Sequence, residues 1–399
     1  MALEATTGKG RLAIVGGRVL PIEGTPFEGG AILVEDGRIA ALGPDIQVPD
    51  GVERVEADGK VILPGLVDAH VHLGVHEEAE GWAGQDTNEM TNPVTPHVRA
   101  LDAINPDDLG FQDAVNGGVL TVNVNPGSGN PIGGQTVAVR CVGRTVDEMV
   151  LRAPSGLKSA LGENPKRVYG ERKEFPSTRL GTAAVIRESF VKAANYLEKL
   201  NHPGGEPVER DLRWEALGMV LRREIPWRQH CHRSDDIATA LRLSDEFGYR
   251  LVIDHGTEAA LLADRIAERG VPVLIGPLLT SRSKVELRRR SIANPGKLAA
   301  AGVEISIITD HPVVPIQLLH VQAALAVKEG LDPEVALRAV TLHPARVLGI
   351  EDRVGSLVPG KAATLCVWSG DPLDVRSRVE RAWVDGLPVL GAEVQDSAA

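Results

Sequence analysis

Short apolar runs separated by turns occupy both ends of the chain. Three such runs lie near the start: Leu12–Val15, Ala31–Val34 and Ile39–Leu42. Asp36-Gly37 stands between the last two, and this dipeptide between apolar runs is typical of a β-hairpin. Similar runs return between residues 350 and 392. We therefore expect residues 1–60 and 350–399 to build one composite β-sandwich.

The long middle part of the chain alternates strand-like runs with helical segments. Eight runs are predicted strands: Val67–Leu73, Val119–Val124, Thr136–Arg140, Gly156–Leu161, Pro226–His230, Arg250–Asp254, Val271–Ile275 and Glu304–Thr309. Three stretches are predicted helices: Thr182–Lys199, Ser234–Phe247 and Glu258–Arg269. This alternation predicts the α/β class, and over residues 61–349 it has the length of a parallel (β/α)8 TIM barrel. The loops after the strands would then build the active face.

His70 and His72 are separated by one residue within the first predicted strand. Side chains two residues apart on a strand point to the same face, so the two imidazoles would converge at the barrel mouth. Such a pair suits Zn²⁺ or a similar ion. The spacing is also compatible with two surface histidines in a β segment, so it does not decide the question alone.

Residues Ile62–Leu73 resemble the metal-binding first strand of the amidohydrolase superfamily, in its imidazolonepropionase-like and Xaa-Pro dipeptidase-like branch. Five later segments continue the resemblance: Gly118–Val122, Ile253–Gly256, Thr309–Pro312, Thr341–Gly349 and Gly355–Lys361. Their order and spacing together are specific, whereas no single segment is. The resemblance implies a (β/α)8 barrel with a metal at the carboxyl ends of its strands, flanked by a small β-sandwich.

The resemblance also implies a set of metal ligands. His230 and His255 fall where the family places its strand-5 and strand-6 histidines, in addition to His70 and His72 on strand 1. Asp310 falls at the strand-8 position, where the family has an aspartate that contacts the metal-bound water and acts as the general base. An aspartate after a strand is otherwise often a helix N-cap. General-base action requires an acceptor within hydrogen-bond reach of the attacking water.

Lys158 decides whether one or two ions are expected. Its surroundings, Gly156–Leu161, resemble the strand-4 segment of binuclear members, where a lysine carbamylated by CO₂ bridges two metals. A lysine cation would repel a metal, whereas its carbamate is an anion. Glu163 is a rival bridging ligand, and a solvent-facing Lys158 is the third possibility. We favour Lys158, with one or two divalent ions, Zn first and Mn, Fe, Co or Ni also suited to such ligands.

Further polar residues near the predicted strand ends are candidates for substrate contacts. His232 shares a strand face with His230, and His311 follows Asp310 directly. Glu163 belongs to the same group if it is not the bridging ligand. Arg282 and Lys284 follow the seventh predicted strand, where they could hold a substrate carboxylate or simply be solvated.

These residues predict a hydrolase acting on carbon–nitrogen bonds. The preferred substrate is the amide of a peptide-like or N-acyl amino-acid compound, as the resemblance implies. A deaminase or an imidazolonepropionase-type cyclic-amide hydrolase is the alternative. Arg233 speaks against both, because those enzymes carry an acid three residues after the strand-5 histidine. A non-catalytic scaffold homologue is the third interpretation, which the full set of four histidines and Asp310 disfavours.

Composition limits the setting and the partners. The chain has 399 residues, a formal net charge of −11 and three cysteines, which fits a reduced, cytoplasmic protein and argues against a nucleic-acid partner. Residues Met1–Arg11 lack the apolar region of a signal peptide, and no apolar run reaches the roughly 18 residues of a membrane span. We expect a small-molecule or short-peptide substrate, no membrane contact and a homo-oligomer.

Overall fold

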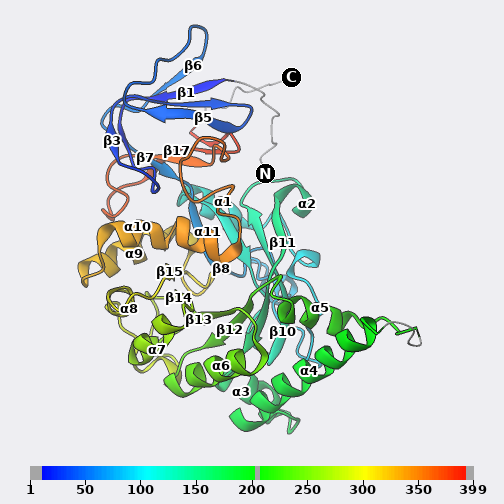
Figure 1. Cartoon of the computed structure of the whole chain (residues 1–399). Coiled ribbons are helices and arrows are strands. Elements are labelled where there is room, and N and C mark those ends of the chain that lie inside the picture. The colour runs from blue at the N-terminus through cyan, green and yellow to red at the C-terminus, as the bar shows by residue number, and fades with distance from the viewer. Residues whose placement is uncertain (1–10, 203–206, 392–399) are drawn as a thin grey trace.

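The chain folds into two parts, a β-rich part that holds both chain ends and a larger barrel (Figure 1). The computed structural model describes residues 11–202 and 207–391. The β-rich part has a four-stranded sheet of order β5-β4-β1-β6 and a six-stranded sheet of order β18-β17-β16-β7-β2-β3. Their strands are β1 (Leu12–Val15), β2 (Arg18–Val19), β3 (Phe27–Glu28), β4 (Ala31–Glu35), β5 (Arg38–Gly43), β6 (Glu53–Glu56), β7 (Val61–Pro64), β16 (Leu365–Trp368), β17 (Val379–Val384) and β18 (Leu387–Leu390).

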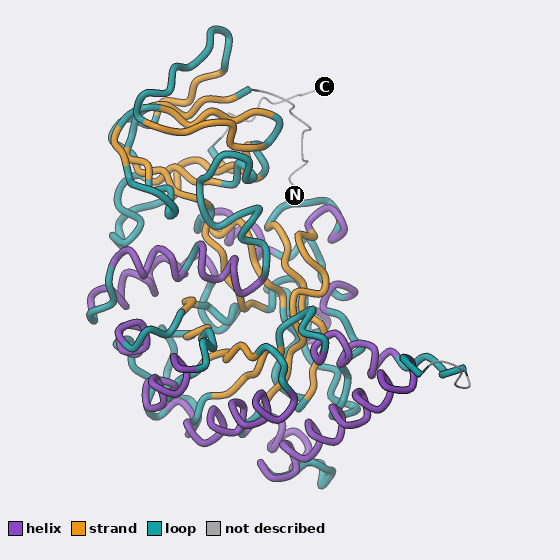
Figure 2. Tube along the Cα trace, in the orientation of Figure 1, coloured by secondary structure: helices purple, strands orange, loops and turns teal. Residues whose placement is uncertain are grey.

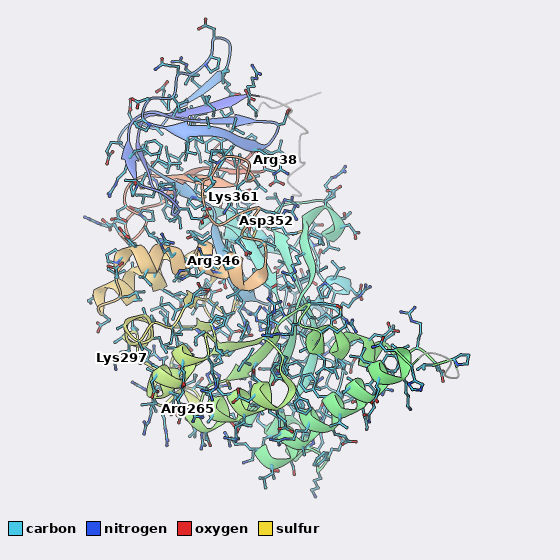
Figure 3. All side chains as sticks on the ribbon, in the orientation of Figure 1. Arg38, Arg265, Lys297, Arg346, Asp352 and Lys361 are labelled. Carbon is cyan, nitrogen blue, oxygen red and sulfur yellow. The ribbon has the colours of Figure 1, made fainter. Side chains whose placement is uncertain are left out.

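The two chain ends meet in the six-stranded sheet. Strand β7 pairs antiparallel with β16, and Arg38 Nη1 donates a hydrogen bond to Gly360 O at 2.7 Å. Arg38 and Lys361 are labelled beside this junction in Figure 3. Apolar side chains of both sheets share one buried cluster that includes Ile32 and Trp383. The expected flanking β structure from both ends is confirmed, while the boundaries at residues 60 and 350 stay a prediction and residues 1–10 and 392–399 lie outside the described residues.

The predicted barrel is also confirmed. Its strands, in spatial as well as chain order, are β8 (Leu66–Val71), β9 (Val119–Val124), β10 (Ile132–Arg140), β11 (Val150–Ala160), β12 (Trp227–Cys231), β13 (Leu251–His255), β14 (Val273–Ile275) and β15 (Ile305–Ile307). Residues that follow β15 hydrogen-bond to β8 and the residue after it, since Asp310 N donates to His70 O at 3.2 Å and His72 N donates to His311 O at 3.0 Å. These bonds nearly close the sheet and bring the first and last strands together.

The barrel differs from an all-parallel one at β10. This strand runs antiparallel to both β9 and β11, whereas every other neighbouring pair in the sheet is parallel. Parallel neighbours need a long crossover, but only residues 125–131 join β9 to β10 and only residues 141–149 join β10 to β11. The short connections therefore force a reversal of direction, and β11 regains the common direction with Lys158 near its carboxyl end.

Helices surround the barrel strands, as Figure 2 shows in purple around orange. They are α1 (Leu109–Asn116), α2 (Val146–Met149), α3 (Glu163–Glu171), α4 (Arg179–Leu200), α5 (Leu212–Leu221), α6 (Ser234–Phe247), α7 (Ala263–Glu268), α8 (Asn294–Ala300), α9 (Leu319–Lys328), α10 (Pro333–Ala339) and α11 (Leu342–Leu348), with 3₁₀ turns at Gly81–Gly84, Ala100–Asp102, Ala259–Leu262, Val285–Leu287 and Ile316–Leu318. Helix α6 starts with acidic residues in its first turn and ends at Gly248 in the left-handed conformation, which are favourable helix ends. Within the described ranges, no helix combines the length and apolar character that crossing a bilayer requires.

Candidate metal centre

A cavity of about 460 Å³ lies at the carboxyl ends of the barrel strands. Two groups of possible metal ligands line it: His70, His72 and Asp310 in the first cluster, and His230, His232 and His255 in the second. Within each cluster the ligand atoms all lie within 4.8 Å of one another. The clusters adjoin, because the ring centroids of His70 and His255 are 4.8 Å apart.

The first cluster combines the paired histidines of strand 1 with the residue after strand 8. Nε2 of His70 and Nε2 of His72 each lie 3.4 Å from Oδ1 of Asp310. Nδ1 of His72 lies 2.8 Å from Asn125 O, and Nδ1 of His70 lies 2.9 Å from Asp254 Oδ2. Since these oxygens accept hydrogen bonds, both Nδ1 atoms act as donors and both Nε2 atoms present lone pairs toward Asp310, the arrangement of metal-binding histidines.

The second cluster consists of three buried histidines. Nδ1 of His255 lies 2.9 Å from Gly276 O, and Nδ1 of His232 lies 2.8 Å from Thr257 Oγ1. Burial lowers the pKa of His255 to about 3 and lowers the pKa of His230 and of His232 well below their usual value. All three rings are therefore neutral near pH 7, the form that binds metals.

One unpaired ring nitrogen of His230 indicates whether the second cluster can accommodate a metal ion. Its Nδ1 is buried and has no hydrogen-bond partner among the described residues. A buried polar atom without a partner costs about 1–3 kcal/mol. A divalent ion would satisfy such an atom, and the imidazole and carboxylate donors of the two clusters match borderline ions such as Zn²⁺. The residues present fit a metal.

Lys158 lies between the two clusters. Its Nζ is 3.0 Å from Nε2 of His70 and 3.4 Å from Oδ2 of Asp254. The side chain is fully buried, and this burial lowers the pKa of Lys158 although Asp254 opposes the shift. The structure therefore brings the strand-4 lysine next to the predicted ligands, where burial shifts its protonation equilibrium toward the neutral amine.

Backbone geometry marks two residues of the site. His255 has a φ of 73° and Asp310 a φ of 53°, in the left-handed region that side chains other than glycine rarely adopt. Such conformations cost about 1–3 kcal/mol each and concentrate at functional sites. Burial favours the neutral acid of Asp310, but the neighbouring imidazoles of His255, His70 and His72 outweigh it and hold the pKa of Asp310 well below its usual value. Asp310 is thus a carboxylate.

Two predicted substrate contacts do not reach the cavity. Glu163 begins α3 and belongs to neither cluster, and its backbone N donates to Glu286 Oε1 at 2.8 Å. Nδ1 of His311 accepts from Ile316 N at 3.2 Å, and its Nε2 lies 3.4 Å from Glu78 Oε1. His311 is therefore directed away from the cavity, because its strand neighbour Asp310 occupies the opposite face.

The remaining predicted contacts lie closer to the chemistry. His232, expected only to touch substrate, is a full member of the second cluster. Lys284 lines the cavity, whereas Arg282 is exposed and donates to Arg288 O at 3.1 Å. Of the two basic residues after strand 7, only Lys284 is available to a bound molecule.

Asp254 and Arg228 support the two clusters from below the cavity and were not among the residues predicted from the sequence. Both side chains are fully buried, and Arg228 Nε donates to Asp254 Oδ1 at 3.0 Å while its Nη2 donates to Ala69 O at 2.9 Å. Two signals could have revealed them. Arg228 precedes His230 by two residues on one strand, and Asp254 is an acid that ends an otherwise apolar strand.

The nearly closed barrel carries two clusters of possible metal ligands at its strand ends, an arrangement that suits a hydrolase with a bound metal. Residues 223–391 match the model of the Amidohydrolase family. A crystal structure of an amidohydrolase from Thermotoga maritima is 48% identical, with a TM-score of 0.92, and the match covers 95% of this chain and 99% of that one. The chain belongs to the amidohydrolase family, whose members are hydrolases acting on carbon–nitrogen bonds. The resemblance inferred from the motifs is confirmed.

Two curated relatives extend the comparison. The chain is 31% identical to the amidohydrolase tasK of Hapsidospora irregularis over 386 residues, which cover 90% of this chain. The match spans only 39% of that longer relative. This chain is also 27% identical to an imidazolonepropionase of Mesorhizobium japonicum, and the match covers 92% of this chain and 91% of that one.

Proposed function

We propose that the chain is a metal-dependent amidohydrolase that cleaves the amide bond of a peptide-like or N-acyl amino-acid substrate. One observation carries the proposal, namely the two adjoining ligand clusters with the buried Lys158 between them. His70, His72 and Asp310 would hold one ion. His230 and His255 would hold a second, with Lys158 as the bridge. Zn is our first choice for the metal, and Mn, Fe, Co and Ni suit the same donors.

Lys158 fits the bridging role only as a carbamate. Its Nζ lies 3.0 Å from the lone pair of His70 Nε2, so an ammonium there would exclude a metal. The neutral amine adds to the carbon of CO₂ and loses a proton, which leaves an anionic carbamate in place of a cation. Burial, which lowers the pKa of Lys158, favours the amine that this addition requires.

Asp310 would move the proton. A bound divalent ion of this type lowers the pKa of a water molecule to about 7 and polarises a carbonyl group. Asp310 would accept the proton of the attacking water and then give it to the amine nitrogen that leaves. Its Oδ1 lies 3.4 Å from Nε2 of His70 and of His72, beside the ion that these three residues would hold. His232, with its Nδ1 tied to Thr257, would touch the substrate beside His230.

A deaminase or cyclic-amide hydrolase is the second candidate, favoured by the imidazolonepropionase relative. Arg233 weighs against it, because this residue forms an ion pair with Asp235 at 2.7 Å and supplies no acid near His230. The cytoplasmic setting, the homo-oligomer and the lack of a nucleic-acid partner remain predictions of the sequence.

Metal counting on purified protein tests the proposal. We expect two ions per chain in the wild type and fewer in Lys158→Ala, with loss of hydrolysis of N-acyl amino acids and dipeptides. Lys297→Ala, on the exposed side of α8, is the matched control and should keep both metal and activity. Equal metal content and activity in Lys158→Ala and the control would contradict the bridging role. Wild-type protein without stoichiometric metal would contradict the proposal as a whole.

A further inference from the structure

The cavity wall carries one charge that the proposed metal chemistry does not use. Among the described residues that line the cavity, Lys284 is the only basic side chain besides Lys158 and the histidines, and Asp310 is the only carboxylate. This contrasts with the acidic chain as a whole, whose formal net charge is −11. Lys284 therefore offers a cation at this wall to an anionic group, beside the acids Glu286, Glu163 and Asp310 that also act on it electrostatically.

Lys284 has no neutralising partner at close range. No ion pair within 4.0 Å involves it in the described part of the chain, and its Nζ donates only to Asn164 Oδ1, at 3.4 Å. Asn164 in turn places its Nδ2 2.8 Å from Ser128 Oγ and 3.4 Å from His230 Nε2. A single amide group thus separates the ammonium of Lys284 from the second histidine cluster.

The loop that carries Lys284 is held in place by a buried ion-pair network. Glu286, two residues further on, is 1% exposed and accepts hydrogen bonds from Glu163 N at 2.8 Å and from Arg179 Nη2 at 2.7 Å. Arg179 also contacts Asp236 on α6. This anchoring fixes the backbone of the loop beside Lys284 before a ligand arrives, so less conformational entropy remains to be lost on binding.

We propose that Lys284, assisted by Asn164, binds the free carboxylate of the substrate and that the substrates are N-acyl α-amino acids or peptides cleaved at their last peptide bond. The inference rests on the amide hydrolysis proposed above. In such substrates only the nitrogen and Cα separate the scissile carbonyl carbon from the carboxylate carbon. Lys284 and His230 each lie 3.4 Å from the side-chain amide of Asn164, so a carboxylate at Lys284 and a carbonyl at the second cluster would be close neighbours, as that short separation requires.

Matched ligand pairs test the inference. Each pair consists of an N-acetyl-L-amino acid and the N-acetyl amine that has the same side chain but lacks the carboxylate. The proteins are the metal-loaded wild type, Lys284→Met, Lys284→Arg and the control Lys297→Met, whose lysine is labelled at the edge of the barrel in Figure 3. Calorimetric affinity, kcat and KM, and metal content are measured for each.

We expect the wild type to prefer the acid of each pair. Lys284→Met should weaken binding of the acid by about 10- to 100-fold, the loss typical of one charge-assisted hydrogen bond. The change should fall mainly on KM and leave affinity for the amine and metal content as in Lys297→Met. Lys284→Arg should restore most of the preference, because it keeps the charge.

The outcomes separate this inference from the proposed function. Equal affinity of wild type and Lys284→Met for the acids, or no binding of the acids at all, overturns the carboxylate site. A carboxylate that binds the metals directly would give the first of these results. Binding that depends on Lys284 without any amide cleavage supports the carboxylate site and contradicts the proposed hydrolysis. If the melting temperature of Lys284→Met shows that this variant is misfolded, Lys284→Gln replaces it in every comparison.

Discussion

Replacing Asp254 by asparagine should destabilise the barrel far more than removing a surface carboxylate. Asp254 accepts from His70 Nδ1 at 2.9 Å, from Arg228 Nε at 3.0 Å and from Lys158 Nζ at 3.4 Å, and it is fully buried. Asparagine keeps the shape of the side chain but loses the negative charge. Its NH₂ group replaces one of the two accepting oxygens and therefore faces another donor. Arg228 would remain as a buried cation without its counter-ion.

The magnitude follows from the cost of breaking a buried ion pair. Removing one partner of such a pair costs about 3–5 kcal/mol. Domains of 150–250 residues lose roughly 2–4 °C of melting temperature per kcal/mol, so we expect a fall on the order of 10 °C. Asp235→Asn removes the exposed partner of Arg233 and should cost no more than about 1 kcal/mol.

Thermal unfolding of chelator-treated protein is the assay, because bound metal would otherwise add its own stabilisation. The double variant Asp254→Leu with Arg228→Met removes both charges and should recover part of the loss, since Arg228 no longer remains as a buried cation without its counter-ion. A melting temperature of Asp254→Asn within about 2 °C of Asp235→Asn would refute the reasoning. So would a double variant less stable than Asp254→Asn.

Two further outcomes follow from the site and the fold. Chelation should lower the melting temperature of the wild type, and added Zn²⁺ should restore it. At a free Zn²⁺ concentration one hundred times Kd, binding should stabilise the folded chain by about 2.7 kcal/mol, which calorimetry can measure. An unchanged melting temperature would contradict metal binding to the folded chain. Gly276→Ala should destabilise the fold by about 1–3 kcal/mol, because the added Cβ would lie 2.3 Å from Ile308 O. It should also weaken metal binding, since Gly276 O accepts the hydrogen bond that orients His255. Gly302→Ala, with nothing within 4 Å of its Cβ, is the control for left-handed strain alone and should leave metal affinity unchanged.

The barrel was predictable because its strands are short apolar runs that end in polar residues. His70 and His72 were placed by period-two alternation, and His255 and Asp310 by their position after apolar strands. The antiparallel direction of β10 was not predictable from its side-chain pattern, since the alternation of apolar and polar residues is the same whichever way a strand runs. The clue lay in the connections, which are too short on both sides of β10 for a crossover helix.

The polar layer beneath the ligands required the sheet register. Asp254 lies opposite His230 in the pairing of β12 with β13, and Arg228 lies opposite Lys158 in the pairing of β11 with β12. The sequence offers signals for each residue alone, but no spacing along the chain encodes which residues of the next strand lie opposite them. The orientation of the His311 side chain could not be predicted for a related reason. It depends on the backbone conformation of Asp310, which lies in the left-handed region.

Asp68 links this polar layer to the geometry of the ligands. Its Oδ2 accepts from Thr309 N at 3.0 Å and from Thr309 Oγ1 at 2.6 Å, while its Oδ1 accepts from His70 N at 3.0 Å. The carboxylate therefore ties β8 to the segment after β15, where barrel closure rests on few backbone hydrogen bonds. His70 is itself one of the donors to Asp68, and Asp310 directly follows the other donor, Thr309. A buried acid at this position, costly by itself, fixes the relative placement of two proposed ligands that are 240 residues apart in the chain.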